Sequence, residues 1–337
     1  MTTVTLEALR SDDYLGFLAA MGAFELLTGN GLDARLGWDG LGGPALLDTQ
    51  LADVDAVAGR LQDVAVKIRA AGALVPASPQ LIDQRRSQAE RKARKAEGIE
   101  ERNDPMRARP EIVRDRFRAV AAQERDGDRV TARWAAALFT MLGLDSGGDA
   151  VLTPLYAPTG QQVLSQLLEK YLVRAGEDGI LMEALVGWRR RSDSGANLDQ
   201  RDLRDAAWGS RGEPDNASVP GATWLALMAI PWFRQVGNGR RAEAVGWERD
   251  RAAVRPKTLL WPVWSGLRSP EAVEVLLSHP AVRAVASAAD GGRDAARRSA
   301  EQSSRLRALG VVAVCKASRA SSGNADGPLQ ATRVVWP

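Results

Sequence analysis

The chain has 337 residues, of which 45% are hydrophobic and 26% charged, an ordinary composition for a globular protein with a sizeable core. No apolar run reaches the length of about 18 residues that a membrane span requires, and the N-terminus lacks the pattern of a signal peptide. Cys315 is the only cysteine, which excludes an internal disulfide. We therefore expect a cytoplasmic protein with no membrane partner.

The basic residues are unusual in kind more than in number. Arginine accounts for 39 of the 45, and its planar guanidinium group suits phosphate and carboxylate groups. A GC-rich genome would also favour arginine codons, and the net charge of +3 is too small to prove a polyanionic partner. The positions of the charges are therefore more informative than their number.

Two segments, 14–27 and 222–233, are apolar nearly all round, which predicts two buried helices. Ser11 or Asp12 is suited to cap the first helix, and residues 29–31 are suited to end it. The small residues of the first segment would let a neighbouring backbone approach closely; they are Gly16, Ala19, Ala20, Gly22 and Ala23.

The remaining pattern alternates helix and strand signals without the order of a doubly wound sheet. Helices are expected at 54–71, 111–123, 131–142 and 161–173, and short strands at 34–38, 244–248, 258–263, 311–315 and 332–336. We expect a mixed, helix-rich α+β fold. Its expected parts are an N-terminal α/β region (1–82), a basic linker or exposed helix (83–110), a central mixed region (111–290) with a long polar loop (190–220), and a C-terminal basic helix with strands (291–337).

Two stretches are locally basic. Residues 83–118 hold twelve basic and eight acidic residues, and residues 291–319 hold seven basic residues against two acidic ones. Either stretch is a solvated helical face or a surface that contacts phosphate groups. The candidate contacts in the first stretch form a supporting phosphate clamp of Arg85, Arg86, Arg91, Lys92, Arg94 and Lys95.

Catalytic machinery is nearly absent from the sequence. His279 is the only histidine, and neither a phosphate-binding loop nor a nucleophile elbow is present. The pairs Asp193/Asp199 and Asp202/Asp205 leave a metal-dependent nuclease open as an alternative. We expect a binding protein with no catalytic residue, no metal and no cofactor.

Two arginine-rich sites are typical of nucleic-acid contacts. Arg189, Arg190 and Arg191 follow Trp188, which places cations beside an aromatic ring. The segment 234–241 surrounds a Gly-Asn-Gly turn whose backbone N–H groups are suited to bind phosphate; its candidate contacts are Arg234, Gln235, Asn238, Arg240 and Arg241. The alternatives are solvated arginines beside a core tryptophan, and an ordinary hairpin turn. Residues 261–264 predict a rigid aromatic turn, which is core or a ligand platform.

Five segments, spread in order along the chain, carry a family resemblance: 15–27, 153–162, 220–234, 244–247 and 306–314. In these segments the chain resembles large-subunit-like proteins of type I CRISPR surveillance complexes (Cascade), nearest the I-G group, formerly I-U. The segments together cover about a fifth of the residues, and none of them is a catalytic signature. At 337 residues the chain is short for a large subunit, so a helical domain is reduced or supplied by another polypeptide.

The resemblance implies a non-catalytic subunit in antiviral defence that binds guide RNA and target DNA together with other Cascade subunits. Such subunits help recognise the motif beside the target, open the duplex and recruit a separate helicase–nuclease, while base pairing recognises the sequence. An assembly or interaction protein of the same defence system, or the carboxylate–metal nuclease, remains an alternative.

Overall fold

The computed structural model describes residues 1–79, 81–82, 92, 96, 106–125, 129–145, 147–156, 163–193, 195–199, 217–239, 241–249, 257–289, 293–322 and 325–337. The helices in these ranges are α1 (Tyr14–Gly29), α2 (Val54–Ala70), α4 (Pro110–Arg125), α5 (Arg129–Leu138), α6 (Leu164–Ala175), α7 (Ile180–Val186), α9 (Pro220–Met228), α10 (Pro270–Ser278), α11 (Pro280–Ala289) and α12 (Arg293–Ala308), with short 3-10 helices η1 (Gly195–Asn197) and η2 (Ile230–Trp232). The strands are β1 (Thr2–Arg10), β2 (Ala34–Trp38), β3 (Pro44–Thr49), β4 (Phe139–Leu144), β5 (Ala150–Leu152), β6 (Arg191–Ser192), β7 (Ala217–Ser218), β8 (Gln235–Gly237), β9 (Ala242–Ala244), β10 (Trp247–Glu248), β11 (Thr258–Trp264), β12 (Val311–Ser322), β13 (Ala325–Leu329) and β14 (Arg333–Trp336).

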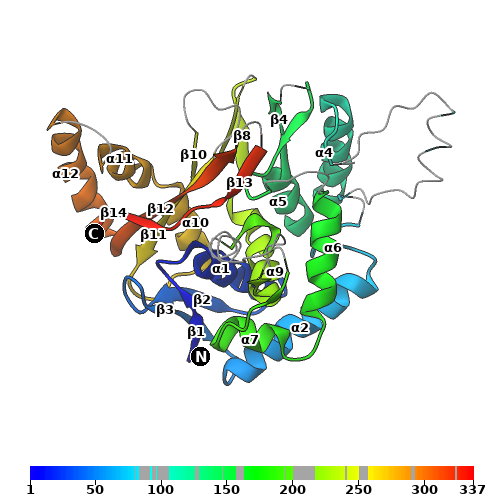
Figure 1. Ribbon diagram of the computed structural model, residues 1–337, viewed down its shortest axis with the longest axis horizontal. Coiled ribbons are helices and arrows are strands. Elements are labelled where there is room, and N and C mark those ends of the chain that lie inside the picture. The colour runs from blue at the N-terminus through cyan, green and yellow to red at the C-terminus, as the bar shows by residue number, and fades with distance from the viewer. Residues whose placement is uncertain are drawn as a thin grey trace, which may run out of the picture.

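The fold is α+β, as the sequence predicts. One antiparallel sheet has the order β1-β3-β2, and a second has the order β10-β11-β12-β13, with β14 paired to β12. The pairs β4–β5, β6–β7 and β8–β9 form small hairpin-like sheets. Figure 1 shows α1 and α9 near the centre, with the first sheet below them and the second above. Sheets made of such short antiparallel strands need helices packed against them to bury their inner faces.

Helix α1 is buried along its whole apolar length, from Tyr14 to Leu27. Asp13 caps the helix, because its side chain accepts hydrogen bonds from the N–H groups of Leu15 and Gly16 at 2.9 and 3.4 Å. The predicted caps, Ser11 and Asp12, are therefore wrong by one or two residues. The predicted end is confirmed, since the helix stops at Gly29 and Gly31 has a φ of +80°.

Close packing of α1 against α9 forms the centre of the core. A Cβ atom added at Gly22 would lie only 1.7 Å from the carbonyl oxygen of Leu225, so the two backbones touch directly. Trp232 extends this contact, because its Nε1–H donates to the carbonyl oxygen of Met21 at 3.1 Å. The expected close approach of a neighbouring backbone is thus confirmed at Gly22. The second apolar segment consists of α9 followed by η2 rather than one continuous helix.

One expected helix changes into a strand. The helix predicted at 131–142 ends at Leu138, and the chain continues as β4. Phe139 and Thr140 pair with Leu152 and Val151 of β5, and aromatic and β-branched residues favour this extended conformation. Pairing with β5 therefore decides the conformation at a point where the helical pattern still continues.

The aromatic segment 261–264 is strand rather than the predicted turn. It belongs to β11, where Trp261 pairs with Cys315 and Pro262 with Val314 of β12. Trp261 and Trp264 are fully buried, and their Nε1–H groups donate to the carbonyl oxygens of Ser11 and Leu36, both at 2.9 Å. These tryptophans are therefore core residues rather than a ligand platform.

A single cluster of buried apolar residues extends from Val4 in β1 to Trp336 in β14. It includes residues of the N-terminal, central and C-terminal sequence regions, so these share one core. The basic helix expected near the C-terminus is confirmed as α12, which packs beside α11 (Figure 1). Among the described residues, no helix has both the length and the apolar character needed to cross a membrane.

Candidate nucleic-acid interface

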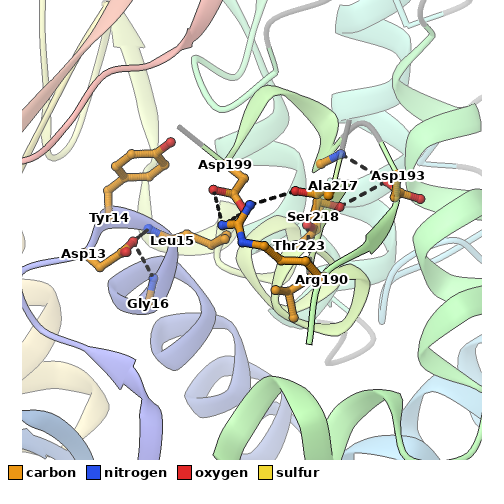
Figure 2. A network of polar contacts seen from close by, with 12 residues as sticks. Asp13, Tyr14, Leu15, Gly16, Arg190, Asp193, Asp199, Ala217, Ser218 and Thr223 are labelled. Carbon is orange, nitrogen blue, oxygen red and sulfur yellow. Dashed lines mark hydrogen bonds and ion pairs between the residues drawn. The ribbon is translucent and has the colours of Figure 1, made fainter. Parts of the chain in front are cut away.

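The three consecutive arginines after α7 have different roles. Arg190 forms an ion pair with the buried carboxylate of Asp199 at 2.8 Å, and its Nη1–H donates to the carbonyl oxygen of Ala217 at 2.8 Å. Figure 2 shows the guanidinium group of Arg190 between these two partners. The group thereby links the two sides of the polar segment 190–220. The expectation that Arg190 contacts nucleic acid is therefore corrected, because its guanidinium group is already engaged within the protein.

Arg191 is also engaged inside the protein. Its Nη2 lies 2.7 Å from Oε1 of Glu183 in α7, and its Nε donates to Oε2 at 3.2 Å, which is a bidentate ion pair. Arg189, in contrast, is exposed, and no described residue forms an ion pair with it. Trp188 is half-buried and donates to the carbonyl oxygen of Ala184 at 3.0 Å. Of the three arginines, Arg189 is thus the one available to a ligand.

A carboxylate hub follows the arginine run. Asp193 forms an ion pair with Lys170 of α6 at 2.9 Å and accepts hydrogen bonds from Tyr171, from Ser218 and from the N–H of Gly195. Burial alone would raise the pKa of Asp193, but the hydrogen bonds from Tyr171, Lys170 and Gly195 and the charge of Lys170 lower it below its ordinary value. Asp193 is therefore an ionised side chain that holds α6, β7 and the turn at Gly195 together.

The hub supports an unusual backbone turn. Gly195, Ala196 and Asn197 all have positive φ angles, of 56°, 51° and 59°, and non-glycine residues adopt this left-handed conformation only at a cost. The turn lies between Asp193 and Asp199 in the chain, and the ion pairs of these two side chains hold it from both sides. These contacts fix the point at which the chain enters the segment 200–216, which lies outside the described residues.

The first pair of candidate metal ligands is already engaged by basic side chains. Asp193 and Asp199 are each paired with a cation of the protein, Lys170 and Arg190. Within the described ranges, no group of three or more histidine, cysteine, aspartate or glutamate side chains is close enough to hold a metal ion. Asp202 and Asp205 lie outside those ranges.

The second arginine-rich site is the β8–β9 hairpin. Arg234, just before β8, forms an ion pair with Glu274 of α10 at 2.9 Å, and both side chains remain partly exposed. Gln235 is buried, and its Nε2 donates to the carbonyl oxygen of Ala137 at 3.0 Å. Gln235 is therefore a packing residue, and the expectation that it contacts nucleic acid is corrected.

The backbone of the hairpin tip is already hydrogen-bonded. The N–H of Asn238 donates to the carbonyl oxygen of Arg241, the N–H of Arg241 to the side chain of Asn238, and the N–H of Gly239 to the carbonyl oxygen of Leu142 in β4. The predicted phosphate grip by backbone N–H groups is wrong for these residues, because their N–H groups are occupied. The alternative of an ordinary hairpin turn is confirmed.

Arg241 is the basic side chain that the tip presents outward. It is exposed, and no described residue forms an ion pair with it. Its neighbour Arg240 lies outside the described residues. So do five members of the phosphate clamp, Arg85, Arg86, Arg91, Arg94 and Lys95, whereas Lys92 is described and exposed.

The structure does not bring the two sites together. In Figure 1, α7 lies toward the lower edge of the molecule and β8 toward its upper edge, so the two elements are well separated. Comparisons with protein-family models and with curated proteins give no match to the chain.

The Lys170–Tyr171–Asp193 hub was not predicted from the sequence, since nothing local indicates that α6 packs against the segment that carries Asp193.

Proposed function

We propose that the chain is a non-catalytic, nucleic-acid-binding subunit of a type I CRISPR surveillance complex in the cytoplasm. In this role it binds guide RNA and target DNA beside other Cascade subunits, and the complex recruits a separate helicase–nuclease. The family resemblance of five ordered segments supports the assignment. The structural observation that carries it is Arg241, an exposed arginine without an ion pair among the described residues, presented by a hairpin in which the N–H groups of Asn238, Gly239 and Arg241 are hydrogen-bonded.

Arg241 has the properties that a phosphate contact requires. An exposed guanidinium without a carboxylate partner needs no ion pair to be broken before it binds a phosphate. The hydrogen bonds of Asn238 and Gly239 fix the hairpin tip, so little conformational entropy is lost on binding. Arg189, in the segment after α7, is exposed as well.

Co-purification with the neighbouring gene products, followed by sequencing of bound RNA, tests the assignment. A uniform repeat-derived RNA in a stable complex is the expected result. A stable complex with protein partners but without nucleic acid would indicate an assembly protein instead. A monomer that binds neither would refute both functions.

We expect Arg241→Ala to weaken binding of single-stranded and duplex DNA without changing the fold. The slope of log K against log salt concentration is negative, and loss of one phosphate contact reduces its magnitude by about one. Fluorescence anisotropy of labelled DNA over a range of salt concentrations measures this slope.

Arg35→Ala is the matched control, because Arg35 is also an exposed arginine but lies on β2, on the opposite side of the molecule from β8 (Figure 1). If the two variants gave equal slopes of log K against log salt concentration, the hairpin would not be part of the DNA interface.

A further inference from the structure

A half-enclosed pocket of about 370 Å³ lies between the β8–β9 hairpin and the junction of α10 and α11. Its volume is in the range of small-molecule sites. Apolar side chains form much of its lining, among them Val236 of the hairpin, Leu260 of β11 and Leu277 of α10. Val236 is 54% exposed, so one wall of the pocket is an uncovered apolar surface. Four polar side chains also line it: Glu243, Ser278, His279 and Arg283. The hydroxyl of Ser278 already donates to the carbonyl oxygen of Glu274 at 2.8 Å, which leaves Glu243, His279 and Arg283 to recognise a ligand.

His279 lies between α10 and α11 and supplies one hydrogen-bond donor. Its Nδ1 accepts a hydrogen bond from the N–H of Ala281 at 3.2 Å, so the proton of the neutral ring is on Nε2. None of the described residues accepts a hydrogen bond from Nε2. This N–H group is therefore available to a ligand.

Arg283 and Glu243 supply a second donor and an acceptor. Nη2 of Arg283 donates to the carbonyl oxygens of Ala244 and Trp247, both at 2.9 Å, which fixes the plane of the guanidinium group. Its Nη1 lies 3.8 Å from Oε2 of Glu243, too far for a hydrogen bond, and both side chains are about half exposed. The two charged groups thus form a loose ion pair in which these two atoms make no hydrogen bond to each other.

We propose that this pocket binds one unstacked nucleobase, and that guanine is the base it fits. Apolar walls bind the faces of a planar ring, and the three polar side chains match groups on its edge. Guanine carries two adjacent N–H donors, which suit the carboxylate of Glu243. It also carries the acceptors O6 and N7, which suit Arg283 and His279.

The other bases match this polar set less well. Adenine and cytosine place a ring acceptor beside their amino group, which sets a lone pair against a carboxylate oxygen. Uracil and thymine have one ring N–H between two carbonyl oxygens, which sets the same carboxylate against acceptors. An aliphatic side chain would fill the apolar part but leave all three polar groups to water.

The proposed base pocket rests on the proposed nucleic-acid-binding function and extends it, because the pocket lies beside Arg241. Glu243 is two residues from Arg241, a distance of about 7 Å along an extended chain. The hairpin that presents the phosphate contact therefore also forms a wall of the pocket. A strand bound to Arg241 has a base within reach of Glu243, so one element would bind both the backbone and a base.

The single histidine gives a direct test on the full chain. A histidine-selective ¹⁵N label produces the ring signals of His279 alone. Titration with guanosine 5′-monophosphate is expected to shift these signals saturably, whereas cytidine 5′-monophosphate and inorganic phosphate shift them little. Equal shifts with inorganic phosphate would overturn the proposal and indicate an anion site. The absence of any shift with the guanine nucleotide would also overturn it.

Glu243→Gln provides the matched variant, because the side chain is half exposed and its replacement keeps the shape. We expect it to weaken guanosine 5′-monophosphate binding by about tenfold, as loss of one bidentate base contact does. An unchanged affinity would refute the role of the carboxylate. Anisotropy with an oligothymidine strand that carries one guanine separates this result from the proposed function. Strand binding without a His279 shift overturns the pocket alone, whereas nucleotide binding without strand binding overturns the function alone.

Discussion

At the scale of single residues, arginine serves the inside of this protein as well as its surface. Arg190 binds Asp199 and the carbonyl oxygen of Ala217. Arg319 is buried and donates to the carbonyl oxygens of Pro154, Leu155 and Gly327. The five N–H donors of a guanidinium group allow it to join several backbone oxygens at once. The large number of arginines is therefore a poor measure of nucleic-acid binding, and each must be judged by its partners.

Cys315 provides a prediction at the same scale. Its side chain is fully buried in β12, and burial, followed by the negative charge of Asp12, raises the pKa of the thiol to about 12. Since the thiolate is the reactive form, we expect iodoacetamide at pH 8 to leave the folded protein unmodified. Mass spectrometry measures the labelling, and the chain unfolded in guanidinium chloride is the control that should react. Rapid modification of the folded protein would contradict the buried position.

At the scale of elements, the contact between α1 and α9 depends on one missing side chain. A Cβ atom at Gly22 would meet the carbonyl oxygen of Leu225 at 1.7 Å, which neither helix can avoid without moving. We expect Gly22→Ala to lower the free energy of unfolding by about 3 kcal/mol. Chemical denaturation followed by circular dichroism measures this change.

Gly59→Ala in α2 is the matched control for the same substitution. Gly59 is exposed in a helix, and a Cβ atom there meets nothing within 4 Å. Alanine has the higher helix propensity, so the free energy of unfolding of this variant should rise by about 0.5–1 kcal/mol. If the two variants changed stability in the same direction, the close approach of α1 and α9 would be refuted.

The same elements show what the sequence can and cannot predict. The apolar helices α1 and α9 were predictable because their composition leaves no polar face. The cap of α1 was not, because the hydroxyl of Ser11 donates to the carbonyl oxygen of Gly40 and accepts from the N–H of Gly42. The strand β4 was not predictable either, because its extended conformation depends on pairing with β5, which a helical apolar pattern does not report.

The candidate site follows the same rule. Exposed arginines such as Arg189 and Arg241 could be proposed from the sequence, because local composition indicates where cations gather. The ion pair of Arg190 with Asp199, and the pocket beside His279, arise from segments that only the folded chain brings together. Long-range contacts thus decide which charges remain available, and no local pattern reports them.

At the scale of the whole molecule, α1 connects both sheets. Its N-terminal side chain, Tyr14, donates from its hydroxyl to the carbonyl oxygen of Leu329 in β13 at 3.0 Å. Its inner face packs on β1, β2 and β3, and Glu25 lies 3.1 Å from the guanidinium of Arg133 in α5. Helix α1 therefore contacts both sheets, whose buried residues belong to the same core.

This arrangement predicts one cooperative unfolding transition. Circular dichroism at far-ultraviolet wavelengths reports the helices, and fluorescence reports the tryptophans that lie in both halves of the sequence, such as Trp38 and Trp264. The two signals should change at the same denaturant concentration, because a shared core leaves no half stable alone. Leu18→Asp places an unpaired charge at a fully buried position of α1 and should abolish the cooperative transition in both signals. Separate midpoints in the unmodified protein, or a Leu18→Asp variant whose C-terminal sheet still melts cooperatively, would show instead that the β10–β14 sheet folds without α1.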